Sequence, residues 1–325
     1  MTTPPNTTSA RHRQALDNGW RFLAGDIPRA LDRDLDDSDW EDVRLPHDWA
    51  ISRPLDPDME QANAQGYQRR AHQGWYRRRF RLQPEPGTRA RLQLDGAYRH
   101  AQVWVNGHAL GVRPSGYATR VHDITDHLQA DGEQLLVVHC DNRGHDGDRW
   151  YCGAGLYRRV WLTQVGDVAV APWGVFVTTP QVRDDQATID ARVALQNDRD
   201  HSVQAQVTAE IRDQQDRVQA TLPAVDVELP AHATAEAGLQ TSLAAPALWS
   251  PESPACYRLC VGVQVDGDEV DRVDQAFGVR TFSFSADRGF EFNGQPRMLQ
   301  GVCLHHDLGC LGTAFFSAGW ERRLQ

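Results

Sequence analysis

Two short stretches of the sequence concentrate side chains that could bind a polar ligand. Asp148 and Trp150 lie in DNRGHDGDRW (residues 141–150), and His305 and His306 stand together in GVCLHHDLG (residues 301–309). A carboxylate can accept two hydrogen bonds from neighbouring hydroxyls, and an indole offers an apolar face. Each residue also has a structural interpretation: a solvated aspartate in an acidic loop, a tryptophan packed in a core, and a histidine with a structural hydrogen bond.

Other conspicuous residues have simpler explanations. We expect the arginines of residues 77–79 to be solvated or paired on the two faces of a strand. The cysteines form no CxxC pair and no convincing zinc spacing. We therefore expect free thiols, no metal and no other cofactor; the cysteines are Cys140, Cys152, Cys256, Cys260, Cys303 and Cys310.

Composition and charge exclude several classes of protein. The hydrophobic share of 40% and the charged share of 24% are typical of globular chains. The net charge of −10 leaves no basic footprint for nucleic acid, and we find no apolar run long enough to span a membrane. The polar start, MTTPPNTTSARHRQ, lacks the apolar run of a secretory signal, so we expect a cytoplasmic location.

Alternation with a period of two predicts a first β-sandwich over residues 1–165. WYRRRFRL (residues 75–82) places its apolar side chains on one face, as a half-buried strand does. The Asn106-Gly107 dipeptide between HAQVWV and HALGV indicates a type I′ hairpin turn. QLLVVHC (residues 134–140) is nearly all apolar, which is typical of a strand covered on both faces.

Cleaner alternation predicts a second, immunoglobulin-like sandwich over residues 166–280. Residues 187–195, 203–211 and 257–265 each carry apolar side chains at every second position. Residues 281–325 begin with a second Asn-Gly hairpin in FEFNGQPRML and continue to Ser317, which we expect to cap a helix.

Six motifs in this order make the chain resemble glycoside hydrolase family 2, in its β-galactosidase-like branch. Members of that family have a jelly-roll sugar-binding domain, an immunoglobulin-like domain and a (β/α)₈ barrel. The resemblance implies the same mainly β architecture here, with residues 281–325 as the start of a barrel that usually needs roughly 250 residues. The motifs are LPHDW, GWYRRRF, VWVNGHALG, DRWYCGAGLYRRVWL, FGVRTFSF and GVCLHHDLGCLG.

The resemblance implies that LPHDW (residues 45–49), with His47 and Asp48, is scaffold of the jelly roll. It also assigns roles to the ligand-binding candidates. Asp148 matches the loop that reaches galactose hydroxyls in these galactosidases. His305 matches the histidine that ends the first barrel strand and contacts substrate, and the adjoining His306 or Asp307 is expected to orient its ring. The family often has Asn and Arg before this histidine, where this chain has Cys303 and Leu304, so the details of sugar contact are open.

Retaining glycosidases use two carboxyl groups roughly 5 Å apart, one as proton donor and one as nucleophile. In the family both are glutamates on later barrel strands, and Glu291 and Glu321 do not have that context. We therefore expect no catalytic residue within these 325 residues and no turnover by this chain alone.

The sequence thus predicts a protein of the β-galactosidase type that would hydrolyse terminal β-galactosides as a full-length enzyme, with carbohydrate as its partner. Two alternatives stay open: a non-enzymatic carbohydrate-binding module, and another activity of the family such as β-glucuronidase or β-mannosidase. The stretch around His305 is more similar to the galactosidase branch, since glucuronidases usually place Lys-His-Glu-Asp near this point.

Overall fold

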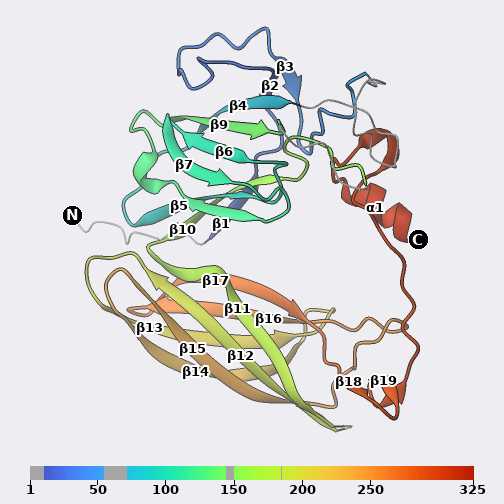
Figure 1. The fold of residues 1–325 in the computed structure, drawn as a ribbon. Coiled ribbons are helices and arrows are strands. Elements are labelled where there is room, and N and C mark those ends of the chain that lie inside the picture. The colour runs from blue at the N-terminus through green and yellow to red at the C-terminus, as the bar shows by residue number, and fades with distance from the viewer. Residues whose placement is uncertain (1–10, 55–71, 144–149, 184) are drawn as a thin grey trace, which may run out of the picture. The chain divides into compact units, whose positions relative to one another are not determined.

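The computed structural model describes residues 11–54, 72–143, 150–183 and 185–325. These residues form two compact units. One, here called the split unit, consists of residues 13–164 and 303–325, and the other, here called the inserted unit, consists of residues 1–12 and 165–302. Both are built mainly from strands, which confirms the predicted mainly β fold of two sandwiches (Figure 1). Among the described residues, no helix has the length and apolar character needed to cross a membrane.

The split unit is a sandwich of two antiparallel sheets. The six-stranded sheet has the order β3-β2-β4-β9-β6-β7, and the four-stranded sheet has the order β1-β10-β5-β8. Their strands are β1 (His12–Ala15), β2 (Trp20–Ala24), β3 (Glu41–Val43), β4 (Gln73–Arg81), β5 (Thr88–Leu94), β6 (Ala101–Val105), β7 (His108–Arg113), β8 (Arg120–Asp123), β9 (Glu133–Asp141) and β10 (Val160–Gly166).

The core of the split unit lies between these sheets and follows the alternation of the sequence. Trp20, Tyr76, Leu92 and Leu136 are buried in it from four different strands. β9 is buried along most of its length, as its apolar sequence predicts. A short 3-10 helix, η1 (Thr125–His127), follows β8.

The Asn106-Gly107 turn joins β6 to β7, which confirms the predicted hairpin. Both residues have positive φ angles, 51° and 83°, and Val105 pairs with His108 across the turn. The Asn106 side chain donates to the carbonyl of His127 and accepts from the backbone N–H of Leu135. A turn of this type therefore also ties β6 to the loop that leads into β9.

Buried arginine, rather than solvated charge, fixes the loop between β2 and β3. Arg77 on β4 is 0% exposed and donates to the Asp37 carboxylate at 2.8 Å and to the backbone carbonyls of Ala30 and Asp32. Arg79 donates to the same carboxylate at 2.7 Å. Arg77 and Arg79 are thus paired, as one of the two interpretations predicts, and they hold the loop of residues 25–40 against the sheet. Arg78 is neither solvated nor paired in the same way: its guanidinium lies over the Trp20 ring, and its buried Nε and Nη1 have no hydrogen-bond partner among the described residues.

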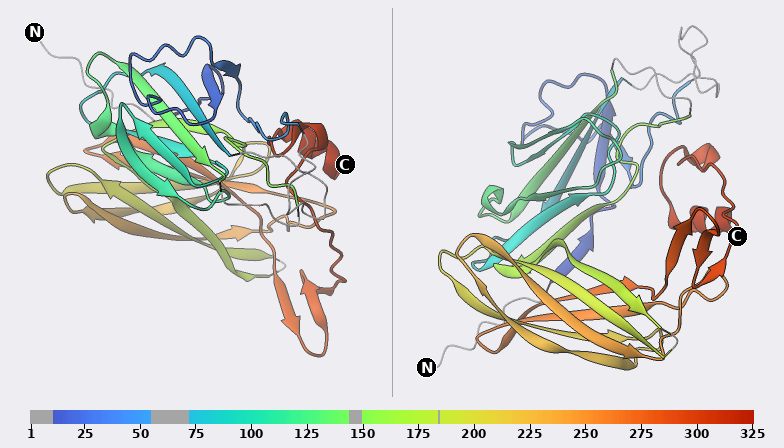
Figure 2. Two further views of the ribbon diagram at one scale, coloured as in Figure 1. Left: turned by 45° about the horizontal axis from the view of Figure 1, so that its top comes forward. Right: turned by 60° about the horizontal axis from the view of Figure 1, so that its bottom comes forward.

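The inserted unit is a seven-stranded sandwich of the immunoglobulin-like kind, drawn from two further directions in Figure 2. Ala187, Ile189, Ala191, Val193 and Leu195 are each 0% exposed, so the alternation points one face of their strand into the core. One sheet is β11 (Val168–Val182), β12 (Gln186–Asn197) and β15 (Ala233–Ala244), and the other is β14 (Val218–Leu229), β13 (Val203–Arg212), β16 (Tyr257–Val265) and β17 (Asp268–Phe277).

A small sheet and one α-helix follow. β18 (Phe282–Ser285), β19 (Gly289–Phe292) and β20 (Gln295–Pro296) pair in sequence, and the predicted Asn-Gly turn joins the last two. The 3-10 helix η2 (Gly309–Leu311) and α1 (Ser317–Leu324) complete the split unit. The expectation that Ser317 caps this helix is wrong: Phe316 is the N-cap residue, because its backbone is extended and no side chain caps the helix there.

All six cysteines are free thiols, as expected.

Candidate functional site

Three of the four predicted ligand-binding residues lie together in the split unit. The ring centroids of Trp150 and His305 are 5.4 Å apart with an interplanar angle of 33°. His306 is the next residue along the chain and is partly buried. Asp148, the fourth, lies outside the described residues. Trp150, His305 and His306 thus lie together although they come from parts of the chain more than 150 positions apart. These three residues, with the tyrosines around His306, are here called the aromatic cluster.

His306 sits among tyrosines. Its ring lies 5.4 Å from that of Tyr117 and 5.8 Å from that of Tyr157. Its Nε2 is 3.4 Å from the carbonyl oxygen of Cys152, so this nitrogen carries the proton and donates. Burial lowers the pKa of His306 below its usual 6.5, so the ring is neutral near pH 7. Nδ1 is therefore the acceptor of this imidazole.

The tyrosines of the aromatic cluster are neutral hydroxyl groups as well. Burial raises the pKa of Tyr117 and of Tyr157 to about 12. Tyr117 keeps 46% of its surface exposed, and its ring lies 5.4 Å from that of Tyr98. Gly116 permits this packing, since a Cβ there would lie 2.2 Å from Cδ2 of Tyr98. The sequence analysis missed these tyrosines because only the folded chain brings them to His306.

One buried carboxylate, that of Asp48, joins three chain segments, two of which also carry residues of the aromatic cluster. Asp48 is 4% exposed and accepts five hydrogen bonds. Its Oδ1 accepts from the backbone N–H groups of Ala50 and Ala154, both at 3.0 Å. Its Oδ2 accepts from the hydroxyl of Tyr151 at 2.9 Å, and from the backbone N–H and Oγ1 of Thr313 at 2.8 and 2.9 Å.

This arrangement, here called the Asp48 clamp, binds the two segments that carry the candidate ligand-binding residues. Tyr151 follows Trp150, and Thr313 belongs to the segment that carries His305 and His306. The contacts agree with the expectation that LPHDW is scaffold. They add that this scaffold sets where the two ligand-binding segments lie.

Two glycines let the segments approach Asp48 closely. Gly153 and Gly312 have φ angles of +67° and +58°, which L side chains rarely adopt. A Cβ at Gly312 would lie 2.3 Å from Oδ2 of Asp48, and one at Gly153 would lie 2.1 Å from Oγ1 of Thr313. Both backbone freedom and space therefore require glycine at these two positions.

The helix α1 also contacts the segment that carries the two histidines. Arg323, in its last turn, donates to the backbone carbonyls of His305 and Asp307. A cation near a helix C-terminus is also favourable to the helix dipole. Arg323 thus holds the backbone at His305, and the described ring contact of His305 is with Trp150. That His306 or Asp307 orients the His305 ring stays a prediction.

Glu291 and Glu321 belong to other surroundings. Glu291, on β19, is 6% exposed and pairs with Arg288 at 3.1 Å. Glu321 is exposed on α1. Neither side chain has a described contact with Trp150, His305 or His306. The described cluster consequently offers aromatic faces and neutral donors and acceptors, which suit binding of a hydroxyl-rich ligand rather than acid–base chemistry.

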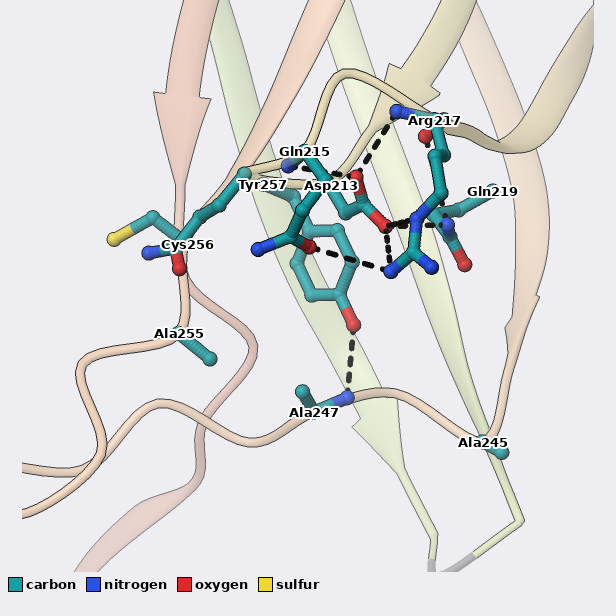
Figure 3. A pocket seen from close by; sticks show the side chains of 10 residues that line it. Asp213, Gln215, Arg217, Gln219, Ala245, Ala247, Ala255, Cys256 and Tyr257 are labelled. Carbon is teal, nitrogen blue, oxygen red and sulfur yellow. Dashed lines mark hydrogen bonds and ion pairs between the residues drawn. The ribbon is translucent and has the colours of Figure 1, made fainter.

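A pocket in the inserted unit has its polar groups already paired. It has a volume of about 240 Å³ and is lined by the β13–β14 turn and the start of β16 (Figure 3). The Asp213 carboxylate accepts from Arg217, Gln219 and the backbone of Gln215. The hydroxyl of Tyr257 accepts from the backbone N–H of Ala247 at 2.8 Å. These bonds stabilise the end of the sandwich and leave little for a ligand.

Family models match both units. Residues 171–280 match the model described as glycosyl hydrolases family 2, and residues 36–146 match that described as the beta-galactosidase second all-beta domain. A beta-galactosidase of Bacteroides ovatus is 37% identical over 98% of this chain, and a putative beta-glucuronidase of Formosa agariphila is 30% identical over 98%. The chain spans 37% and 30% of the lengths of these two relatives.

Solved structures agree. A glycosyl hydrolase family 2 member from Bacteroides cellulosilyticus superimposes with a TM-score of 0.91 at 32% identity, covering 96% of this chain and 41% of that one. A Bacteroides uniformis beta-glucuronidase superimposes with a TM-score of 0.84 at 29% identity, covering 96% and 38%.

Proposed function

Because this chain belongs to glycosyl hydrolase family 2, we propose that its split unit supplies part of the sugar-binding site of a retaining glycosidase that hydrolyses terminal β-galactosides. The observation that carries this proposal is the aromatic cluster of Trp150, His305 and His306. The beta-galactosidase of Bacteroides ovatus, similar along 98% of the chain, supports galactose as the sugar. Within the proposal, residues 1–165, 166–280 and 281–325 are a jelly-roll domain, an immunoglobulin-like domain and the start of a barrel.

Each residue of the aromatic cluster has a binding task that its chemistry fits. The Trp150 ring packs against the C–H face of the sugar, since the negative face of an aromatic ring attracts polarised C–H groups. Nδ1 of the neutral His306 accepts from a hydroxyl, and the Tyr117 hydroxyl can both donate and accept. We assign Asp148 to two further hydroxyls, on the strength of its position two residues before Trp150.

Catalysis is assigned to neither glutamate near the end of the chain. Glu291 is buried in an ion pair, and Glu321 lies exposed on a helix. Two carboxyl groups roughly 5 Å apart are needed for hydrolysis with retention, and the described cluster holds no such pair. We expect this chain alone to bind sugar and not to cleave a chromogenic β-galactoside above an empty-vector preparation.

Calorimetric titration of the chain with galactose tests the binding role. We expect Trp150→Ala to weaken galactose binding about tenfold, which corresponds to the loss of one aromatic contact. The matched control is Phe282→Ala, which removes an exposed aromatic side chain of the inserted unit that belongs to neither proposed site. Equal galactose affinity in the wild type and in Trp150→Ala would show that the aromatic cluster is structural.

The same titration with glucuronate separates the alternative activity. Relatives named beta-glucuronidases are 30% identical or less, and their substrate carries a carboxylate that galactose lacks. A glucuronate affinity at least tenfold above the galactose affinity would replace the galactosidase proposal by the glucuronidase alternative.

A further inference from the structure

Two large aromatic side chains stand exposed on β11 of the inserted unit. Trp173 is 71% exposed and Phe176 is 53% exposed. Neither contributes to the core of the sandwich, whose β11 members are Val168, Val170 and Val175. Exposed large aromatics close together are unusual on a protein surface and commonly mark a binding site.

The strand register shows what surrounds them on the outer face of the sheet. Phe176 pairs with Arg192 on β12, which pairs with Gly238 on β15. Trp173 lies at an irregularity of β11, and a Cβ on its neighbour Gly174 would lie 2.7 Å from the carbonyl oxygen of Ala194. Trp173 stands three residues before Phe176, in the stretch between Val170 and Val175 where the pairing of β11 with β12 is interrupted.

Polar side chains lie on both sides of the row formed by Phe176, Arg192 and Gly238. Thr178, Asp190 and Gln240 make the adjoining row across the three strands. On the other side Ala194 pairs with Glu236. Nothing lies within 4 Å of where a Cβ at Gly238 would stand, so the surface beyond Arg192 is open. The guanidinium of Arg192 lies over the Phe176 ring, 5.1 Å from its centroid.

We propose that this face, made by Trp173, Phe176 and the polar residues beside them, binds a neutral oligosaccharide chain. The aromatic rings stack on the C–H faces of sugar rings, and the carboxylates of Asp190 and Glu236 with the amide of Gln240 bond their hydroxyls. The site, here called the β11 face, lies wholly within the inserted unit and does not depend on the aromatic cluster.

The apolar area argues against a second copy of the chain as the occupant. A tryptophan and a phenylalanine bury roughly 150–250 Å² each, whereas a stable protein interface buries roughly 1,200–2,000 Å² in total. The remaining outer-face residues of the sheet are polar or small: Thr178, Thr188, Asp190, Arg192, Ala194, Gln196, Thr234, Glu236, Gly238, Gln240 and Ser242. A sugar chain needs only such a small apolar contact, with many hydroxyl partners around it.

Native affinity electrophoresis of the chain in gels containing β-1,4-galactan, xyloglucan or galactomannan tests this proposal. We expect retardation by at least one polymer, and about tenfold weaker binding in Trp173→Ala and in Phe176→Ala. The matched control is Phe282→Ala, which removes another exposed phenylalanine, 61% exposed, from the same unit. Equal melting temperatures of the variants will show that the sandwich is intact.

Three outcomes would contradict the proposal that the β11 face binds an oligosaccharide. The first is no retardation of the wild-type chain by any of the three polymers. The second is retardation that Trp150→Ala abolishes and Trp173→Ala leaves unchanged, which would place the polymer at the aromatic cluster and leave the proposed function standing. The third is a wild-type dimer in solution that Trp173→Ala converts to monomer, which would make the face a contact between copies.

Discussion

Replacing Asp48 by asparagine should release the C-terminal segment of the split unit. The substitution keeps the size of the side chain but turns one of its acceptor oxygens into an NH₂ donor. If this donor stands at the Oδ1 position, the N–H groups of Ala50 and Ala154 both lose their acceptor. If it stands at the Oδ2 position, only the N–H of Thr313 does, because hydroxyls can turn to accept.

The second orientation is cheaper, so the damage falls on Thr313. One lost hydrogen bond to a charged acceptor costs about 1.5–3 kcal/mol, and the remaining bonds weaken because the charge is gone. We expect a loss of about 2–3 kcal/mol, which raises the population of the detached segment roughly 30- to 160-fold. Since His305 and His306 lie on that segment, sugar binding should weaken with it.

Hydrogen–deuterium exchange of residues 303–325 measures this opening directly. In Asp48→Asn we expect exchange of that segment to accelerate while β4 and β9 exchange as before. The control is Asp42→Asn, whose side chain is 72% exposed and whose partner Arg21 is 3.8 Å away, and we expect less than about 0.5 kcal/mol there. Unchanged exchange in Asp48→Asn, with stability within about 0.5 kcal/mol, would refute the clamp.

Three further substitutions test other parts of the split unit. Burial lowers the pKa of His47 to about 4, below the value of about 6.5 in the unfolded chain, so the folded protein loses up to about 3 kcal/mol of stability as pH falls from 6.5 toward 4. Urea unfolding at both ends of this range should show a smaller pH dependence of stability in His47→Gln. Arg77→Met should cost about 3 kcal/mol in the same assay, whereas Arg81→Met, 88% exposed at its side chain, should cost under about 0.5. Gly312→Ala should destabilise more than Gly107→Ala, since both have positive φ but only the former meets an atom within 4 Å; equal losses would show that backbone strain alone matters.

Local sequence patterns predict the strands well because an alternating pattern and the strand that it forms lie within the same short stretch of the chain. The alternation of residues 187–195 becomes a buried strand face, and each Asn-Gly pair becomes a hairpin turn. Helix capping was less predictable: Ser317 has the chemistry of a cap, yet the chain enters the helix one residue earlier, at Phe316.

The site was predictable only as far as the family resemblance reached. It indicated Trp150, His305 and His306, which the fold brings together. It gave no sign of Tyr117, and the expectation for Asp48 stopped at scaffold. The clamp joins residues 265 positions apart, and no spacing within one stretch can encode such a contact. The depth of burial of Arg77 likewise depends on a loop 40 residues away.

The discontinuity of the split unit has a consequence for how the protein is made. Residues 13–164 leave the ribosome first, yet the partners of Asp48 near residue 313 follow only after the whole inserted unit has been translated. At about 5–20 residues per second, the 139 positions from 164 to 303 take roughly 7–28 s, long enough for the inserted unit to fold meanwhile. During that interval Asp48 lacks its two hydrogen bonds from Thr313, so the split unit is incomplete. A nascent chain stalled before residue 303 should therefore be more open to protease around residues 45–54 and 150–157 than a chain that includes residues 303–325.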